Sequence, residues 1–168
     1  FDGCYKLSGR PRDFIQRFVV GGRVMLSHNE KKIRKGEIAD FDAVSEYPSA
    51  MERMKGLLKG KPKILKNKSF EWLKSNSDGF FVKCLCLNDP TIKRAFSVLS
   101  IKDEKGIRQF TNNTKGETYY LDKTSYEDAV EHQGLDFKII CGYYYNEGRN
   151  DKMKSAIRHL FNARLEAK

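Results

Sequence analysis

The segment DFDAVSEYPSAM, residues 40–51, combines residue types that could hold a metal ion and a triphosphate. The pattern predicts a short strand over 35–43 and a helix with Pro48 in its first turn, where the missing N–H of proline costs nothing. A carboxylate at the strand end, Asp42, suits Mg²⁺, which prefers hard oxygen ligands. The free N–H groups of the helix start suit phosphate oxygens, and Tyr47 would lie beside a sugar. The alternative is an ordinary strand–helix junction with an aspartate cap and Tyr47 in the core.

The same segment resembles motif A of family B DNA polymerases, whose pattern is D-x-x-S-L-Y-P-S. The matching residues are Asp42, Ser45, Tyr47, Pro48 and Ser49. The form DFDAVS-x-YPSAM is most similar to the protein-primed branch, found in small phages, adenoviruses, linear plasmids and related mobile elements. A weaker collinear pattern extends the resemblance over 19–168. It includes VVGGR at 19–23, a partial match to a Y-x-G-G-type element, and the stretch from TYYLDK to GYYY at 118–145.

The resemblance implies a template-directed, Mg²⁺-dependent DNA polymerase that adds deoxynucleotides to a primer. Asp42 would be the catalytic and metal-binding residue in a site of two Mg²⁺ ions. The residues implied in nucleotide binding are Ala43, Val44, Ser45, Glu46, Tyr47 and Arg164. Within this set, the backbone of 43–46 and Ser45 would bind the triphosphate, and Tyr47 would exclude ribose by blocking the 2′-hydroxyl.

The chain departs from the family pattern in ways that affect activity. Glu46 replaces the usual Leu. Its carboxylate would either add a negative charge beside the triphosphate pocket or help to bind the metal ion. Neither motif B (K-x-x-x-N-S-x-Y-G) nor motif C (Y-x-D-T-D) occurs in 1–168. Two-metal nucleotidyl transfer needs a second aspartate. We therefore expect the chain to be an excised part of a longer polymerase and to be inactive alone, without binding the two metal ions.

Basic residues near the end of the chain could serve the incoming nucleotide. Apolar residues at helical spacing predict a helix that begins near Asp151. Counting along this helix from Ile157, the resemblance places Arg164 where a basic residue of the family reaches the nucleotide phosphates. The guanidinium fork suits phosphate. The alternative is a solvated face of a basic helix.

A run of lysines without an acidic residue follows the motif. It contains Lys55, Lys59, Lys61, Lys63, Lys66 and Lys68. Because glycine and proline interrupt 55–68, we expect an exposed loop. Its cations would contact the phosphates of a DNA primer–template without reading sequence. The alternative is a solvated loop with no partner.

The composition favours a nucleic-acid partner. Lys and Arg number 32 against 22 Asp and Glu, a net charge of +10, which is typical of proteins that bind polyanions. No apolar run approaches the roughly 18 residues of a membrane span, and the charged N-terminal residues do not form a secretory signal. The expected partners are DNA, deoxynucleoside triphosphates and, by resemblance, a priming terminal protein, with no membrane. The expected location is the cytoplasm of the host cell, where the four cysteines would be free thiols.

The remaining elements complete an α+β prediction. Strands are predicted at 79–87, 94–101, 107–111, 117–121 and 136–145, with a helix from Thr124, capped through Glu127 and ended by Gly134. The expected architecture is a partial polymerase palm with an inserted β-rich subdomain and a C-terminal helix. The palm segment with motif A would span 1–55, the insertion contacting terminal protein and DNA 56–145, and the helix leading to the fingers 146–168. The alternative function is a stand-alone, non-catalytic module that binds nucleic acid or a priming protein.

Overall fold

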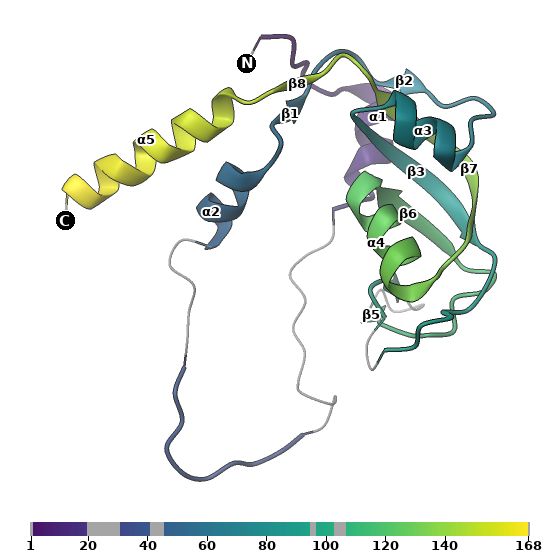
Figure 1. Ribbon diagram of the computed structural model, residues 1–168, viewed down its shortest axis with the longest axis horizontal. Helices are drawn as coiled ribbons and strands as arrows, with labels where there is room; N and C mark the ends of the chain where they lie inside the picture. Colours follow the sequence, from purple (N-terminus) through teal and green to yellow (C-terminus); the bar gives the residue numbers. More distant parts are fainter. Residues whose placement is uncertain (1, 20–30, 41–45, 95–96, 103–106, 168) are drawn as a thin grey trace. The chain divides into compact units, whose positions relative to one another are not determined.

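The computed structural model describes residues 2–19, 31–40, 46–94, 97–102 and 107–167 (Figure 1). The chain divides into two units. The first unit comprises Phe1–Tyr5, Gly22–Gly60 and Glu147–Lys168, and the second comprises Lys6–Gly21 and Lys61–Asn146. Each unit brings together segments that are far apart in the sequence, so its contacts could not be inferred from neighbouring residues.

Helices and strands alternate irregularly along the described residues, which confirms the predicted α+β class. In chain order they are α1 (Gly9–Gln16), α2 (Glu46–Arg53), β1 (Leu57–Leu58), β2 (Lys63–Ile64), α3 (Phe70–Asn76), β3 (Gly79–Cys86), β4 (Ile101–Lys102), β5 (Arg108–Gln109), β6 (Thr118–Asp122), α4 (Lys123–Gln133), β7 (Phe137–Tyr145), β8 (Arg149–Asn150) and α5 (Lys152–Glu166). The elements α2, β1, β8 and α5 belong to the first unit, and the others belong to the second.

An antiparallel sheet in the order β2-β7-β3-β6 forms the centre of the second unit. Successive residues of a strand point to opposite faces, and in β3 the residues Phe80, Val82, Cys84 and Cys86 are almost fully buried on one face. Aromatic rings of α3 and α4 pack against Phe80 there. Burial raises the pKa of the Cys84 thiol to about 12. The predicted strand at 79–87 and the predicted free thiols are confirmed.

The opposite face of this sheet is partly covered by α1, a helix that the sequence analysis did not predict. The ring of Phe14 lies 5.8 Å from Tyr120 and 5.4 Å from Tyr143, between centroids. Phe18, just after the helix, lies edge-on to Phe81 at 5.3 Å. Such edge-to-face pairs add to the stabilisation from burial. The basic, glycine-containing sequence of this region hides the helix, because its apolar partners lie on distant strands.

Hydrogen bonds at both ends fix the length of α4. The Asp122 carboxylate accepts from the backbone N–H of Ser125 at 2.8 Å and caps the N-terminus. The predicted cap at Thr124 with Glu127 is therefore wrong, because β6 runs directly into the helix and Asp122 is its last extended residue. Gly134 ends the helix at φ 60° and confirms the predicted end, since the left-handed region favours glycine.

The predicted exposed loop at 55–68 contains two strands. β1 pairs with β8, and β2 pairs with β7. The prediction failed because both partner strands lie far along the chain and leave no local signal. The predicted strand at 35–43 is also wrong over 35–40, which belongs to no strand, and 41–43 lies outside the described residues.

The predicted strands at 94–101 and 107–111 pair with each other, but both predictions are too long. Among the described residues of these two segments, antiparallel pairing is confined to β4 and β5, with Ile101 opposite Gln109. Residues 97–100 precede β4 without strand structure. Here Val98 N donates at 2.6 Å to the side chain of buried Gln133. This side-chain bond replaces the strand pairing that the apolar pattern predicts.

Candidate nucleotide site and basic surface

The second half of the motif A-like pattern lies in the first turn of α2. This helix begins at Glu46, which confirms the predicted helix with Pro48 in its first turn. An acidic residue in the first turn interacts favourably with the helix dipole, so Glu46 has a local structural role in place of the family's Leu. Tyr47 is 78% exposed, and the alternative in which it packs in the core is wrong. Asp42, Ala43, Val44 and Ser45 lie outside the described residues.

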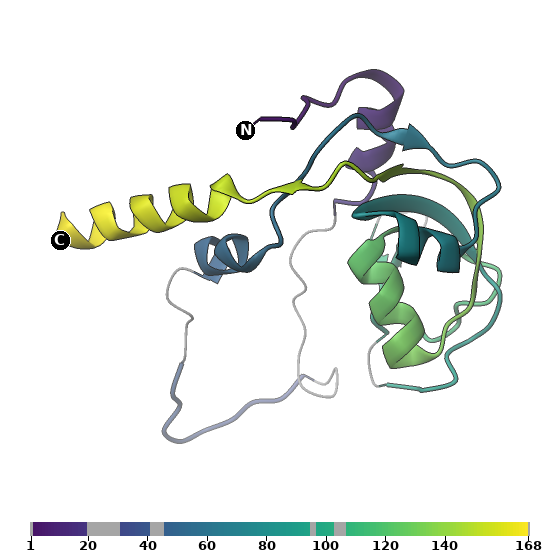
Figure 2. The same cartoon turned by 45° about the horizontal axis from the view of Figure 1, so that its top comes forward.

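The short ladder of β1 with β8 positions α2 against α5 within the first unit. Leu57 is opposite Asn150. Gly56, at φ 97°, lies so close to this strand that an added Cβ would overlap the carbonyl oxygen of Asn150. Because α2 precedes β1 and α5 follows β8, the two helices leave the ladder side by side (Figures 1 and 2). The ladder therefore joins the helix of the motif to the basic C-terminal helix.

An ion pair links these two helices. The Nε of Arg158 donates to Oε1 of Glu52 at 3.0 Å, and its Nη2 contacts the same oxygen. Arg164 is exposed in the last turn of α5, where a cation interacts favourably with the helix dipole. The ion pair that the structure shows between α5 and α2 is made by Arg158. The position of Arg164 relative to a bound nucleotide stays a prediction.

Asp2, near the N-terminus, forms hydrogen bonds with residues at and just before the start of α5. Asp2 accepts a hydrogen bond from Lys152 Nζ at 2.9 Å, and this bond lowers the pKa of the Asp2 carboxyl below its usual value. The backbone oxygen of Asp2 accepts from Asn150 Nδ2 at 3.0 Å. The sequence predicts neither the Asp2–Lys152 bond nor the Glu52–Arg158 pair. The partners are 150 and 106 positions apart, so no spacing rule could have found them.

The six lysines are divided between the two units. Lys55 and Lys59 belong to the first unit, and the other four belong to the second. Lys63 Nζ donates to Asn146 Oδ1 at 2.6 Å, and Lys68 Nζ lies 4.5 Å from the centre of the Trp72 ring. Lys55 and Lys66 are exposed, whereas Lys59 is half-buried. Lys63 and Lys68 are exposed as well, so these two lysines combine a contact to a protein group with access to solvent.

Among the described residues, no group of three or more His, Cys, Asp or Glu side chains is arranged to hold a metal ion. The predicted metal ligand, Asp42, lies outside this part of the chain. In the same part of the chain, no helix is both long and apolar enough to span a membrane.

Comparison with known proteins identifies a family. The family model described as DNA polymerase type B, organellar and viral, matches residues 2–168. No curated protein and no solved structure matches the chain significantly. The family match covers both units.

Proposed function

Because the chain belongs to the organellar and viral type B DNA polymerases, we propose that it supplies the motif A segment of a protein-primed, template-directed DNA polymerase. The observation that carries the proposal is the D-x-x-S-x-Y-P-S pattern at the start of α2, inside a family match over 2–168. Motif A would lie in a palm segment at 1–55, with a β-rich insertion at 56–145 and a fingers-leading helix at 146–168. The antiparallel sheet of the second unit supports a separate β-rich part.

Each residue of the motif has a distinct role in this proposal. Asp42 would hold Mg²⁺ through its carboxylate, together with an aspartate of a Y-x-D-T-D motif that residues 1–168 do not contain. When bound, the metal ions would neutralise charge on the transferred phosphoryl group. Backbone N–H groups at 43–46 would bind triphosphate oxygens at the start of α2. Tyr47 would lie beside the nucleotide sugar, and its largely exposed side chain supports this role.

The first test replaces Asp42 by Asn in the full polymerase chain that contains this segment with motifs B and C. The amide cannot supply the anionic oxygens that hold Mg²⁺, so single-nucleotide primer extension should fall by about three decades or more. DNA binding, measured by fluorescence anisotropy, should be retained. If Asp42→Asn extends a primer at nearly the parental rate, the segment is not a polymerase motif A, and a non-catalytic binding module becomes the better proposal.

Protein priming has a separate test. The full chain is incubated with Mg²⁺, a labelled deoxynucleotide and the replication proteins of its own element, without any oligonucleotide primer. We expect label to become covalently attached to a protein hydroxyl, in a band that resists denaturation and disappears with Asp42→Asn. Synthesis that strictly requires an oligonucleotide primer would contradict protein priming, while leaving the polymerase proposal intact.

A further inference from the structure

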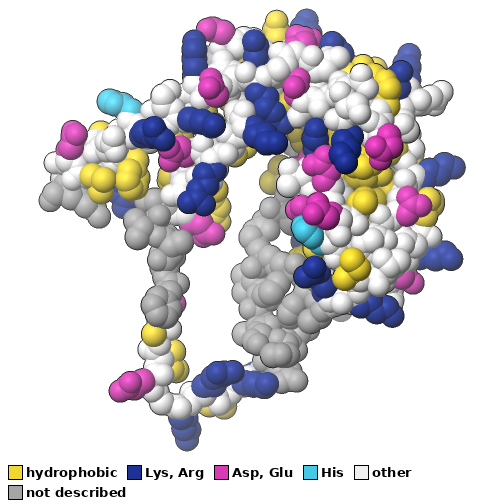
Figure 3. All heavy atoms as spheres, viewed as in Figure 1, with side chains coloured by type: hydrophobic (Ala, Val, Ile, Leu, Met, Phe, Trp, Pro, Cys, Tyr) yellow, Lys and Arg dark blue, Asp and Glu magenta, His cyan; other side chains and the backbone are white. Residues whose placement is uncertain are grey.

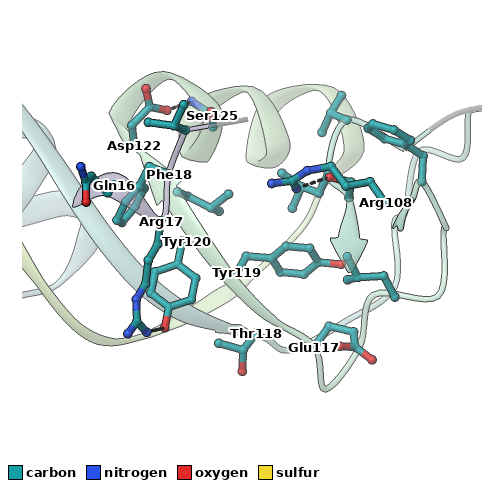
Figure 4. A pocket seen from close by; sticks show the side chains of 17 residues that line it. Gln16, Arg17, Phe18, Arg108, Glu117, Thr118, Tyr119, Tyr120, Asp122 and Ser125 are labelled. Carbon is teal, nitrogen blue, oxygen red and sulfur yellow. Dashed lines mark hydrogen bonds between the residues drawn. The ribbon is translucent and has the colours of Figure 1, made fainter. Parts of the chain in front are cut away.

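A groove of about 730 Å³ runs along β6 in the second unit (Figure 4). Its volume lies within the range of ligand sites in proteins. All residues from Glu117 to Asp122 line it, including Tyr119 and Tyr120, which belong to opposite faces of the sheet. A cavity lined by both faces of one strand must lie at the edge of that strand. Since β3 covers one edge of β6, the groove follows the other edge.

The backbone of β6 is open toward this groove. Cys86 N donates to Glu117 O at 2.9 Å, and Leu87 N donates across to Asp136 O at 2.9 Å. Bonding directions alternate along an antiparallel pair, so Thr118 and Tyr120 direct their N–H and C=O groups away from β3. No strand of the described residues pairs with this edge. An open row of donors and acceptors is a template for another strand.

Two guanidinium groups reach the groove from different elements (Figure 4). Arg17, at the end of α1, donates to the Tyr120 hydroxyl at 2.8 Å. Arg108, on β5, is half-buried and donates to Ser100 Oγ at 2.9 Å. Among the described residues, neither guanidinium pairs with a carboxylate, and the Asp122 carboxylate caps α4. Glu117 also lines the groove. Each guanidinium carries five donors that suit a carboxylate, and the hydrogen bonds to Tyr120 and Ser100 each use one of them, so the groove has unused donors for acidic groups.

We propose that this groove binds an extended, acidic segment of a partner protein, which adds to β6 as a further strand. A peptide backbone supplies the alternating donors and acceptors that Thr118 and Tyr120 require. A nucleic-acid strand would supply phosphates for the arginines but no regular donors for the outward C=O groups. Apolar side chains at Val98, Leu99 and Ile101 line the groove and accept alternate side chains of the segment. This activity goes beyond nucleotide addition.

The probe is a fluorescently labelled peptide of alternating valine and glutamate, titrated into the full polymerase chain and followed by anisotropy. We expect it to bind more tightly, by about tenfold or more, than an alternating valine–lysine peptide, because each guanidinium gains a carboxylate partner. N-methylation of alternate backbone amides should weaken binding by a similar factor. Absence of binding, or binding unaffected by N-methylation, would overturn the proposal.

Two variants locate the site. Thr118→Pro removes an outward N–H, which an edge strand tolerates, and should weaken peptide binding about five- to tenfold. Thr118→Val keeps the N–H and should bind as the parent does. Arg108→Gln should weaken binding, whereas Arg12→Gln, an exposed α1 cation outside the groove, should not.

Thermal melting checks that these variants fold, and primer extension should remain at the parental rate, which separates this proposal from the polymerase proposal. Parental peptide affinity in folded Thr118→Pro and Arg108→Gln would overturn the groove assignment. If oligothymidylate displaces the peptide from the parent protein, and this displacement is lost in Arg108→Gln, the groove binds nucleic acid instead.

Discussion

At the scale of single residues, Tyr47 tests the nucleotide site independently of the metal ligand. Its side chain is 78% exposed in the first turn of α2, and the proposed function places it beside the sugar of a bound nucleotide. We expect Tyr47→Val to keep deoxynucleotide incorporation measurable and to raise ribonucleotide incorporation relative to it, because space opens beside C2′. Primer extension with paired deoxy- and ribonucleotides measures this ratio.

Glu46 provides the neighbouring control for Tyr47. Its carboxylate lies at the same helix start but is not assigned to the sugar. Glu46→Leu should leave the ratio of ribonucleotide to deoxynucleotide incorporation unchanged, while overall activity stays the same or rises. An equal change in the ratio for both variants would mean that Tyr47 has no specific role.

At the scale of elements, the N-terminal cap of α4 differs between the sequence prediction and the structure. Asp122 accepts from Ser125 N at 2.8 Å, whereas Thr124 is an exposed residue inside the helix. We expect Asp122→Ala to lower the free energy of unfolding by about 1 kcal/mol, the usual cost of removing an N-cap. Thr124→Ala should change it by less than about 0.5 kcal/mol. Urea denaturation of both variants measures the difference, and the reverse order would restore the predicted capping box.

At the scale of the whole molecule, the net charge of +10 favours binding to DNA. Lys and Arg side chains occur over both units and are interspersed with acidic ones on the face shown in Figure 3. Lys55 and Lys66 are the lysines of the run that remain exposed without a described contact to protein. Replacing both by Gln should make the slope of log affinity for primer–template against log salt concentration less steep. The slope should change by about 0.9 for each DNA phosphate that the protein no longer neutralises.

A charge-matched control separates this effect from general electrostatics. Lys74 and Lys138 are also exposed but lie outside the run. Their double replacement by Gln removes the same charge and should leave the salt slope unchanged. Equal slopes for the two double variants would mean that Lys55 and Lys66 do not contact the DNA.

The sequence by itself determined the elements whose signals are local. A nearly continuous apolar run identified β3, proline in the first turn identified α2, and Gly134 identified the end of α4. These patterns act over a few residues, through side-chain direction and the allowed backbone angles. The motif A pattern also identified the family. The roles of Asp42 and its neighbours remain predictions, and the exposure of Tyr47 became known only from the structure.

The tertiary structure alone decided which distant segments meet. It placed β1 against β8 within the supposed loop, packed α1 onto the sheet, and brought Arg158 to Glu52. It also left the outer edge of β6 open along a groove. Strand pairing is made by backbone groups that every residue shares, and ion pairs form wherever the fold brings opposite charges together. Such contacts leave no local pattern in the sequence, because the partners are separated by tens of residues and are chosen by the packing of the whole unit.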